Sequence, residues 1–181
     1  MRFLLVEDIN DDLEVADQEF SSAATSINSS KLPAIFKLVK FDPNTINLDY
    51  GGGRFDNAAE FLITQDVENL VYDPYNRSAE HNAEVLKKVR SNGGADTVTC
   101  SNVLNVIKEP QARMSVIKNI ATLLKSSGVA YFTVYEGTKL GDERETKAGY
   151  QLNRPTSSYV EEIEQVFTNV VRKGKLIIAQ K

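Results

Sequence analysis

The sequence predicts a doubly wound α/β fold, in which helices cover both faces of a mostly parallel sheet and an antiparallel strand closes one edge at the C-terminus. Three observations predict it. Between residues 44 and 137, short segments rich in β-branched and aromatic residues alternate with helical segments. Three adjacent glycines, at residues 51–53, follow the first clear strand directly. Residues 170–181 end the chain as a hairpin or a pair of strands.

Apolar spacing and end signals predict each element of this core. Strands rich in Val, Ile, Tyr and Thr are expected over residues 45–50, 67–72, 95–101 and 129–137. Helices are expected over residues 55–63, 79–92, 109–127 and 158–167. Asp73-Pro74 ends the second strand, and Pro110 lies in the first turn of the third helix, with Gly128 beyond its end.

Residues 1–43 are expected to form an N-terminal helical extension to a core of residues 44–181, within a single domain. The elements expected in this extension are a strand over residues 1–8 and helices over residues 11–24 and 26–41. Acids open the first of these helices near its positive end. Ser29 or Ser30 can cap the second, and Pro33 suits its first turn.

Composition limits the classes of function. With 181 residues, 41% hydrophobic and 25% charged, the chain can bury the core of one globular domain. No stretch approaches ~18 consecutive apolar residues, so we expect no membrane span and a cytoplasmic location. Cys100 is the only cysteine, so an internal disulfide is excluded. Because His81 is also the only histidine, we expect no metal site. We expect His81 to be a solvated surface side chain. The formal net charge of −4 gives no global attraction to nucleic acid.

The glycines Gly51, Gly52 and Gly53 stand between a strand and a helix. Such a loop is a flexible turn, or it lets a ligand lie against the backbone beside a helix N-terminus. Asp73, 24 residues after Asp49, ends the next strand. A carboxylate there can accept both hydroxyl protons of a ribose, or it can simply form an Asp-Pro turn. Together the loop and the acid indicate an adenosyl-bearing ligand.

The string "LDYGGGRFDN" resembles motif I of the class I S-adenosylmethionine-dependent methyltransferases, an acid and any residue followed by G-x-G-x-G. Asp49, Gly51 and Gly53 match, and Phe55 replaces the last glycine. "LVYDPYNRS" looks like the second motif, and the resemblance covers about residues 44–181, which implies a Rossmann-like fold. Within the family, strings such as "YDPYNRS" and "SNVLNVIKEPQAR" look most like methyltransferases associated with DNA phosphorothioation gene clusters.

The resemblance implies S-adenosylmethionine as cofactor and a set of residues that hold it. Asp49 would order the loop or meet the methionine amino group through water, and Asp73 would hold the ribose. The other implied contacts are Gly51, Gly52 and Gly53 beside the ligand, Pro74 and Tyr75 around the adenine, and Ser101 and Asn102 at the methionine end. Between Asp73 and Asp96 there is room for a helix but little for a third strand, so the usual acidic partner of the adenine amino group is not placed.

The sequence leaves the methyl acceptor, a small molecule or a nucleic acid, unidentified. A sulfonium is already an activated leaving group, so alignment and exclusion of water supply much of the acceleration. A base is required only for a protonated acceptor. Tyr75, Tyr135, Glu136 and Asn102 are candidates by position alone, and no catalytic residue is assigned. "SNVLN" lacks an N-P-P-Y type tetrad, so an exocyclic amine in DNA is not supported.

The polar segment of residues 137–159 is long for a connection, which is typical of a lid, a binding loop or a disordered segment. Its acids offset its lysines and arginines, so it forms no clear phosphate-binding patch. With the N-terminal forty residues it would form the acceptor site. A large substrate would then require a homodimer or a partner subunit.

Three alternatives stay open at this point. A non-catalytic S-adenosylmethionine-binding partner subunit is favoured by Phe55 in the loop and by the short middle region. An NAD-dependent oxidoreductase would use Asp73 equally well on its ribose. The start "MRFLLVEDIN" resembles a response-regulator receiver domain, although the glycine run is out of place there.

Overall fold

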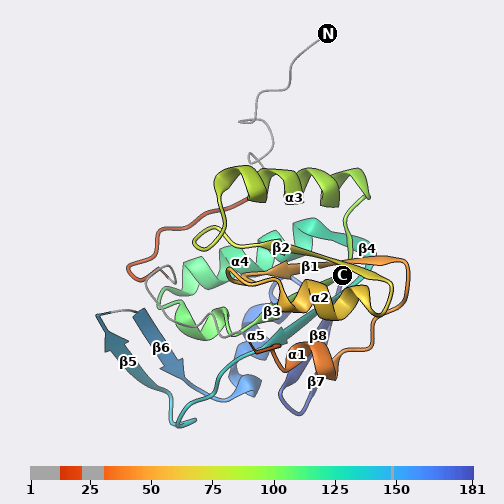
Figure 1. Ribbon diagram of the computed structural model, residues 1–181. Helices are drawn as coiled ribbons and strands as arrows, with labels where there is room; N and C mark the ends of the chain where they lie inside the picture. Colours follow the sequence, from red (N-terminus) through yellow and green to blue (C-terminus); the bar gives the residue numbers. More distant parts are fainter. Residues whose placement is uncertain (1–12, 22–30, 148) are drawn as a thin grey trace.

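The computed structural model describes residues 13–21, 31–147 and 149–181, and its centre is a six-stranded sheet (Figure 1). The strands of this sheet, in spatial order, are β2 (Val67–Tyr72), β1 (Thr45–Tyr50), β3 (Ala95–Ser101), β4 (Leu124–Thr133), β8 (Leu176–Gln180) and β7 (Asn169–Lys173). The first four are parallel, whereas β8 pairs antiparallel with both β4 and β7. The predicted doubly wound fold with an antiparallel C-terminal edge is therefore confirmed.

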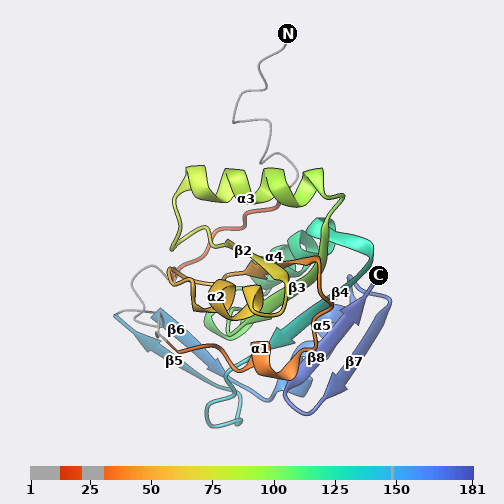
Figure 2. The same ribbon diagram turned by 45° about the vertical axis from the view of Figure 1, so that its right-hand side comes forward.

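Helices cover both faces of the sheet (Figure 2). The face with the larger apolar core carries α3 (Ala79–Ser91), α4 (Pro110–Leu123) and α5 (Val160–Glu164). The opposite face carries α1 (Ile35–Leu38) and α2 (Asn57–Ile63). The buried aromatics Phe132 and Phe167 meet edge to face in the larger core, with ring centroids 6.3 Å apart.

The chain reverses its direction across the sheet at β1. It passes from β1 to β2 on one side and then returns through α3 to β3 on the other side. No separate strand lies between α3 and β3, as the sequence predicts. At such a switch point the loops beyond the carboxyl ends of the strands leave a crevice, which is where ligands bind in open α/β sheets.

Residues 13–21, which we call the strap, run in extended form along α4. Asn119 of α4 accepts a hydrogen bond from the Glu14 amide at 2.8 Å and donates one to the Glu14 carbonyl at 2.7 Å. Its side-chain amide also donates to the Tyr50 hydroxyl at 3.1 Å. Asn119 therefore joins the strap, α4 and the end of β1.

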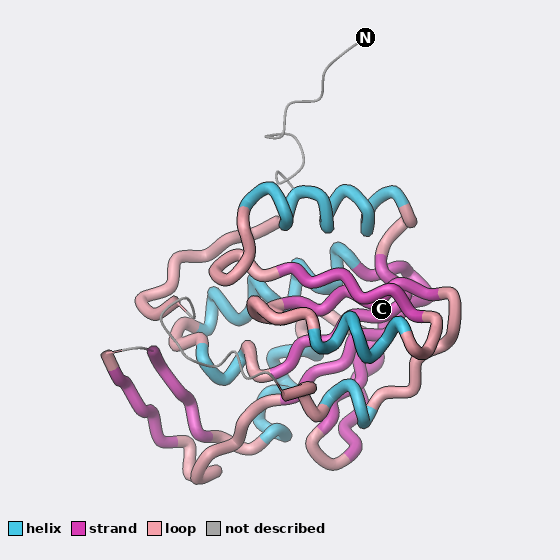
Figure 3. Tube along the Cα trace, in the orientation of Figure 1, coloured by secondary structure: helices cyan, strands magenta, loops and turns pink. Residues whose placement is uncertain are grey.

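A two-stranded hairpin, β5 (Asp142–Thr146) with β6 (Gly149–Asn153), projects beside the main sheet (Figure 3). Asn105, in the short 3₁₀ helix η3 (Leu104–Val106), donates to the Gln151 side chain at 3.0 Å. The strap meets the same hairpin, because Phe20 stacks on Tyr150 with ring centroids 6.0 Å apart. The hairpin and the strap thus lie together over η3.

The structure corrects several predictions. Residues 13–21 are not helical, although they fall within the predicted helix 11–24. Of the predicted helix 26–41, the described residues 31–41 form one helical turn, Ile35–Leu38, so the described part of residues 1–43 is not a helical extension. Residues 1–8, Ser29 and Ser30 lie outside the described residues. The segment of residues 137–159, predicted as a loop, contains the β5–β6 hairpin. Gly128 was expected just beyond a helix, and it lies within β4 because α4 passes directly into that strand.

The last predicted helix also differs in form. Residues 158–167 were expected to be one helix, and the chain instead forms the 3₁₀ helix η4 (Thr156–Tyr159) followed by the short α5. Tyr159 and Ile163 are buried on it. The α-helix is therefore shorter than predicted.

Replacing Asn119 with alanine should release the strap. The substitution leaves the Glu14 carbonyl and the Tyr50 hydroxyl without this partner, and we expect a loss of about 1–3 kcal/mol of unfolding free energy. Limited proteolysis should then cleave within residues 13–21 faster. Lys118→Ala is the matched control on the same helix, because its exposed 3.4 Å pair with Glu14 contributes little. Equal cleavage rates in the two variants would contradict this role of Asn119.

Candidate functional site

A cavity of about 170 Å³ lies beyond the carboxyl ends of β1, β2 and β3. The strap covers it with Glu14, Val15, Ala16 and Gln18, and α4 adds a wall of Ala112, Ser115, Val116 and Asn119. Every residue that the sequence predicts at the cofactor lines this cavity: Asp49, Gly51, Gly52, Gly53, Asp73, Pro74, Tyr75, Ser101 and Asn102. The fold therefore brings together three segments that are far apart in the sequence.

The glycine loop needs glycine for steric reasons. Gly51 has a φ of +75°, and a Cβ there would lie 2.5 Å from Cγ2 of Val103. A Cβ on Gly52 would lie 2.4 Å from the Asp49 carboxylate and 2.8 Å from Val71. Because real Cβ contacts are longer, both positions exclude a side chain, and the backbone of the loop lines the cavity directly.

Asp49 is a buried carboxylate at the base of the loop. Its Oδ1 accepts a hydrogen bond from the Thr99 hydroxyl at 3.0 Å. Burial raises the pKa of the Asp49 carboxyl from 3.8 to about 7; the Thr99 hydrogen bond opposes this and the nearby Asp73 carboxylate adds to it. A cation in the cavity would favour the ionised form.

Asp73 connects the two loops that border the cavity. Its Oδ2 accepts from the Gly53 amide at 2.9 Å, and its Oδ1 accepts from the amides of Tyr75 and Asn76 at 3.0 Å. The Asn76 side-chain amide also donates to both oxygens at 3.2 Å. Asn82 of α3 holds the Asp73 backbone through its amide and carbonyl. Asp73 thus forms the predicted turn and also faces the cavity.

In the described part of the chain, the charged side chains that line the cavity are all acidic. Among the lining residues that the structure describes, Glu14, Asp49 and Asp73 carry carboxylates, and none is lysine, arginine or histidine. The remaining polar groups are hydroxyls and amides. Such a lining favours a neutral or cationic ligand over an anionic one.

Some residues of the site were missed by sequence reasoning. Arg77 donates to the carbonyls of the glycine loop, and Asn82, Thr99 and Asn119 hold the lining residues in place. Arg77 lies within the string "LVYDPYNRS", but no role was assigned to it, and Asn82, Thr99 and Asn119 belong to no quoted motif. The available signal was their spacing, since Arg77 and Asn82 follow Asp73 within one turn-and-cap segment and Thr99 lies two residues before Ser101 in the same strand.

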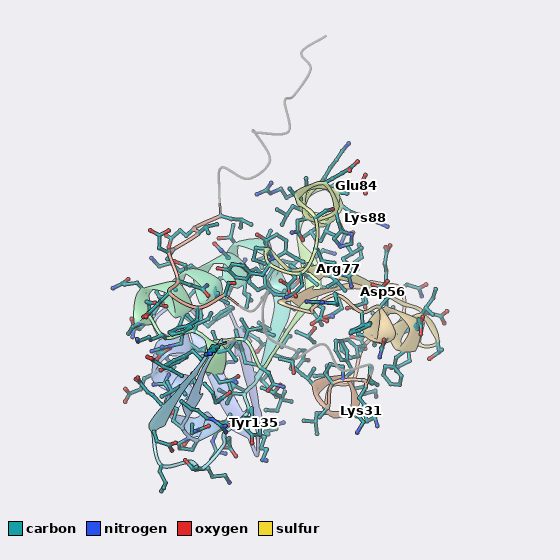
Figure 4. The ribbon with its side chains drawn as sticks, turned by 60° about the vertical axis from the view of Figure 1, so that its left-hand side comes forward. Lys31, Asp56, Arg77, Glu84, Lys88 and Tyr135 are labelled. Carbon is teal, nitrogen blue, oxygen red and sulfur yellow. The ribbon has the colours of Figure 1, made fainter. Side chains whose placement is uncertain are left out.

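The candidate bases have unequal support. Tyr135 is 61% exposed and does not line the cavity, and in Figure 4 it lies far from Arg77. Glu136 binds the Thr156 amide and hydroxyl, and that backbone hydrogen bond lowers its pKa to about 2. Burial raises the pKa of Tyr75, with the charge of Asp73 adding, so its hydroxyl stays protonated at neutral pH. Asn102 lines the cavity but has no ionisable group.

His81 is not the solvated side chain that we predicted. It is partly buried, and its Nε2 lies 2.8 Å from the Val71 carbonyl, which gives it a structural contact with β2. No group of three or more potential metal ligands occurs in the parts of the chain that the structure describes. Nor does any helix in those parts have the length and apolarity to cross a membrane.

Comparison with known families decides the class of protein. A family profile described as "Methyltransferase domain" matches residues 24–167. The chain belongs to this methyltransferase family. The class I resemblance of the glycine loop and the Rossmann-like fold agree with this family. The receiver-domain alternative does not, because a receiver domain would not account for the glycine loop. Comparison with the curated proteins gives no match.

Solved structures of methyltransferases share the fold. The 1,6-didemethyltoxoflavin-N1-methyltransferase of Burkholderia thailandensis, solved with S-adenosylhomocysteine, matches with a TM-score of 0.55 and 17% identity over 77% of this chain and 72% of that one. The complex between the Haloferax volcanii Trm112 methyltransferase activator and a methyltransferase matches with a TM-score of 0.52 and 13% identity, over 76% and 67% of the chains. The mitomycin 7-O-methyltransferase MmcR matches with a TM-score of 0.51 and 17% identity, over 87% of this chain and 52% of that one. At these identities the likeness shows the fold.

Replacing Asp49 with asparagine should stabilise this methyltransferase at alkaline pH. Because the folded pKa, about 7, exceeds the unfolded value, the folded state binds the extra proton and loses stability as pH rises from about 4 to 7. We expect the difference in unfolding free energy between Asp49→Asn and wild type to grow, in favour of the variant, by about 1–3 kcal/mol from pH 5 to pH 8. Thermal melts of both proteins at the two pH values measure this. A stability difference that does not change with pH would contradict the assignment.

Proposed function

We propose that this methyltransferase binds S-adenosylmethionine in the cavity and transfers its methyl group to a small acceptor beside the strap. The observation that carries the proposal is the charge of the lining, with buried carboxylates at Asp49 and Asp73 and no basic side chain among the described lining residues. S-adenosylmethionine presents a ribose diol, an ammonium group and a sulfonium. These are the groups that such a lining complements.

The residues present fit this cofactor. Gly51, Gly52 and Gly53 carry no side chains and their backbone lines the cavity, so a ligand could lie close against the loop. Asp73 would accept the ribose hydroxyls, which would replace the Asn76 side-chain amide on its oxygens. Asp49 would balance the positive charge at the methionine end, and Tyr75 with Pro74 would cover the adenine. When bound, the cofactor supplies an activated methyl group, and the residues of the cavity orient the acceptor and exclude water.

An NAD-dependent oxidoreductase is less well supported. The diphosphate of NAD is anionic and binds at glycine loops whose surroundings are positive or neutral. Here the Asp49 carboxylate lies directly behind Gly52, and no described lining side chain is a cation. Placing a diphosphate against this loop would bring like charges together.

The lining also favours a small acceptor over a nucleic acid. Asp17, Glu19 and Glu109 add further carboxylates near the mouth of the cavity, as the electrostatic influence of Asp17 and Glu109 on Tyr75 indicates. Among the described residues, two lysines contact the strap and both are paired with acids: Lys108 with Glu19 and Glu145, and Lys118 with Glu14. A polyanion would meet an acidic rim. The link to DNA phosphorothioation, which rests on short sequence strings, stays a prediction.

A partner subunit is also proposed. One of the structural neighbours is a methyltransferase in complex with an activator, so an activating partner or a second copy of this chain would be consistent with a compact catalytic domain. A partner could supply the base that the described cavity lining does not identify. A non-catalytic role of the chain itself would show as cofactor binding without turnover.

Calorimetric titration with S-adenosylmethionine, S-adenosylhomocysteine and NAD tests the cofactor assignment. We expect both adenosyl sulfur compounds to bind and NAD not to bind. Asp73→Asn should weaken binding at least about tenfold, because an amide nitrogen would then face the donors of the loop. Glu60→Gln, at an exposed acid of α2 that does not line the cavity, is the control and should change the affinity little. Unchanged binding by Asp73→Asn would overturn the site.

Fluorescence anisotropy tests the acceptor class. We expect a labelled 20-base-pair DNA duplex and a single-stranded RNA not to bind at 50 mM salt, with or without S-adenosylhomocysteine, because the rim is acidic. The double substitution Asp17→Lys and Glu19→Lys should introduce weak binding. Salt-dependent binding of the wild-type protein would favour a nucleic-acid acceptor instead.

A further inference from the structure

The N–H and the carbonyl of Gly53 are both hydrogen-bonded to side chains of the loop that follows β2. Its amide donates to Asp73 Oδ2 at 2.9 Å, and its carbonyl accepts from Nε of Arg77 at 2.7 Å. Arg77 in turn donates its own backbone amide to the Asp73 carbonyl at 3.1 Å. The same turn therefore presents an acceptor and a donor to the backbone of a single residue of the glycine loop.

Arg77 also holds the part of the loop that contains no glycine. Its second terminal nitrogen donates to the Phe55 carbonyl at 3.0 Å and to Asp56 Oδ1 at 2.7 Å. The Arg77 side chain is only 13% exposed, and Figure 4 shows it beside Asp56, between the two loops. We call this set of contacts, from Arg77 to Gly53, Phe55 and Asp56, the Arg77 bridge. The planar guanidinium suits it, because one rigid group reaches two carbonyls and a carboxylate.

A loop with Phe55 at its third motif position has less backbone freedom than one with glycine there. The Phe55 side chain is 43% exposed, so packing of its ring contributes little to fixing the backbone. The contacts that fix residues 53–56 are instead polar, and they come largely from Arg77. The loop conformation thus depends on a residue outside the loop and outside the cavity lining.

We propose that Arg77 is a positioning residue for the cofactor, which holds the glycine loop in the conformation that accepts S-adenosylmethionine. This inference rests on the proposed function. Arg77 does not line the cavity, so it acts through the Gly53 and Phe55 carbonyls. The geometry of its guanidinium, and not its charge alone, carries the role. An ammonium group in its place has the charge but cannot reproduce the fork.

The experiment compares wild type with Arg77→Lys, Arg77→Gln and Lys88→Gln. Calorimetry gives the affinity for S-adenosylhomocysteine, and hydrogen exchange of the ligand-free proteins reports on the peptide that covers residues 51–57. Both Arg77 variants should bind at least about tenfold more weakly and exchange faster in this peptide. Exchange in β4 should stay as in wild type, which shows that the variants are folded. Lys88→Gln should resemble wild type, because it removes only an exposed ion pair with Glu68 that lies outside the Arg77 bridge.

The outcomes separate the two proposals. If Arg77→Lys restores wild-type affinity, charge suffices and the geometric role is overturned. If both Arg77 variants bind normally, the positioning role is overturned while the proposed function stands. If wild type binds neither adenosyl sulfur compound, the proposed function fails. In that case hydrogen exchange of the ligand-free proteins still tests the Arg77 bridge. Exchange over residues 51–57 that is the same in wild type and the Arg77 variants would overturn it.

Discussion

The arrangement of the cavity depends on one carboxylate, that of Asp73. It accepts hydrogen bonds from the glycine loop through Gly53 and from its own turn through Tyr75 and Asn76. Two loops that follow neighbouring parallel strands are thereby held in a fixed relation. Since β1 and β2 are paired in register from Thr45–Val67 to Tyr50–Tyr72, the sheet places the two loops next to each other before any ligand binds.

Function and stability conflict at Asp49. A buried carboxylate with one hydroxyl donor is unfavourable in the free protein, as its raised pKa shows. In the proposed function, the same group would provide the charge that a cationic ligand needs, in a place where water does not screen it. Residues that weaken the empty fold and suit a ligand are common at binding sites. The acidic lining is consistent with that pattern and separates this cavity from dinucleotide sites of similar topology.

The compact core leaves much of the enclosure of the cavity to peripheral segments. No strand stands between α3 and β3 in the described chain, and the strap closes the cavity along α4 instead. Asn119 fixes the start of the strap, and the stack of Phe20 on Tyr150 fixes its end against the β5–β6 hairpin. The acceptor would therefore meet surfaces from three separate regions of the sequence. Their contacts decide which molecules can enter.

The sequence by itself determined the sheet, the glycine loop and the acids at the ends of β1 and β2, because apolar periodicity and strand-end motifs are local signals. It did not determine the strap, the hairpin or the short α1, since residues 13–21 have helix-compatible acids and become extended only through contacts with Asn119 and Tyr150. The contacts of Arg77 could likewise not be predicted, because they are made to carbonyls more than twenty residues earlier in the sequence. Tertiary packing alone brings such polar partners together, so it decided how the cavity is closed and how its loop is held.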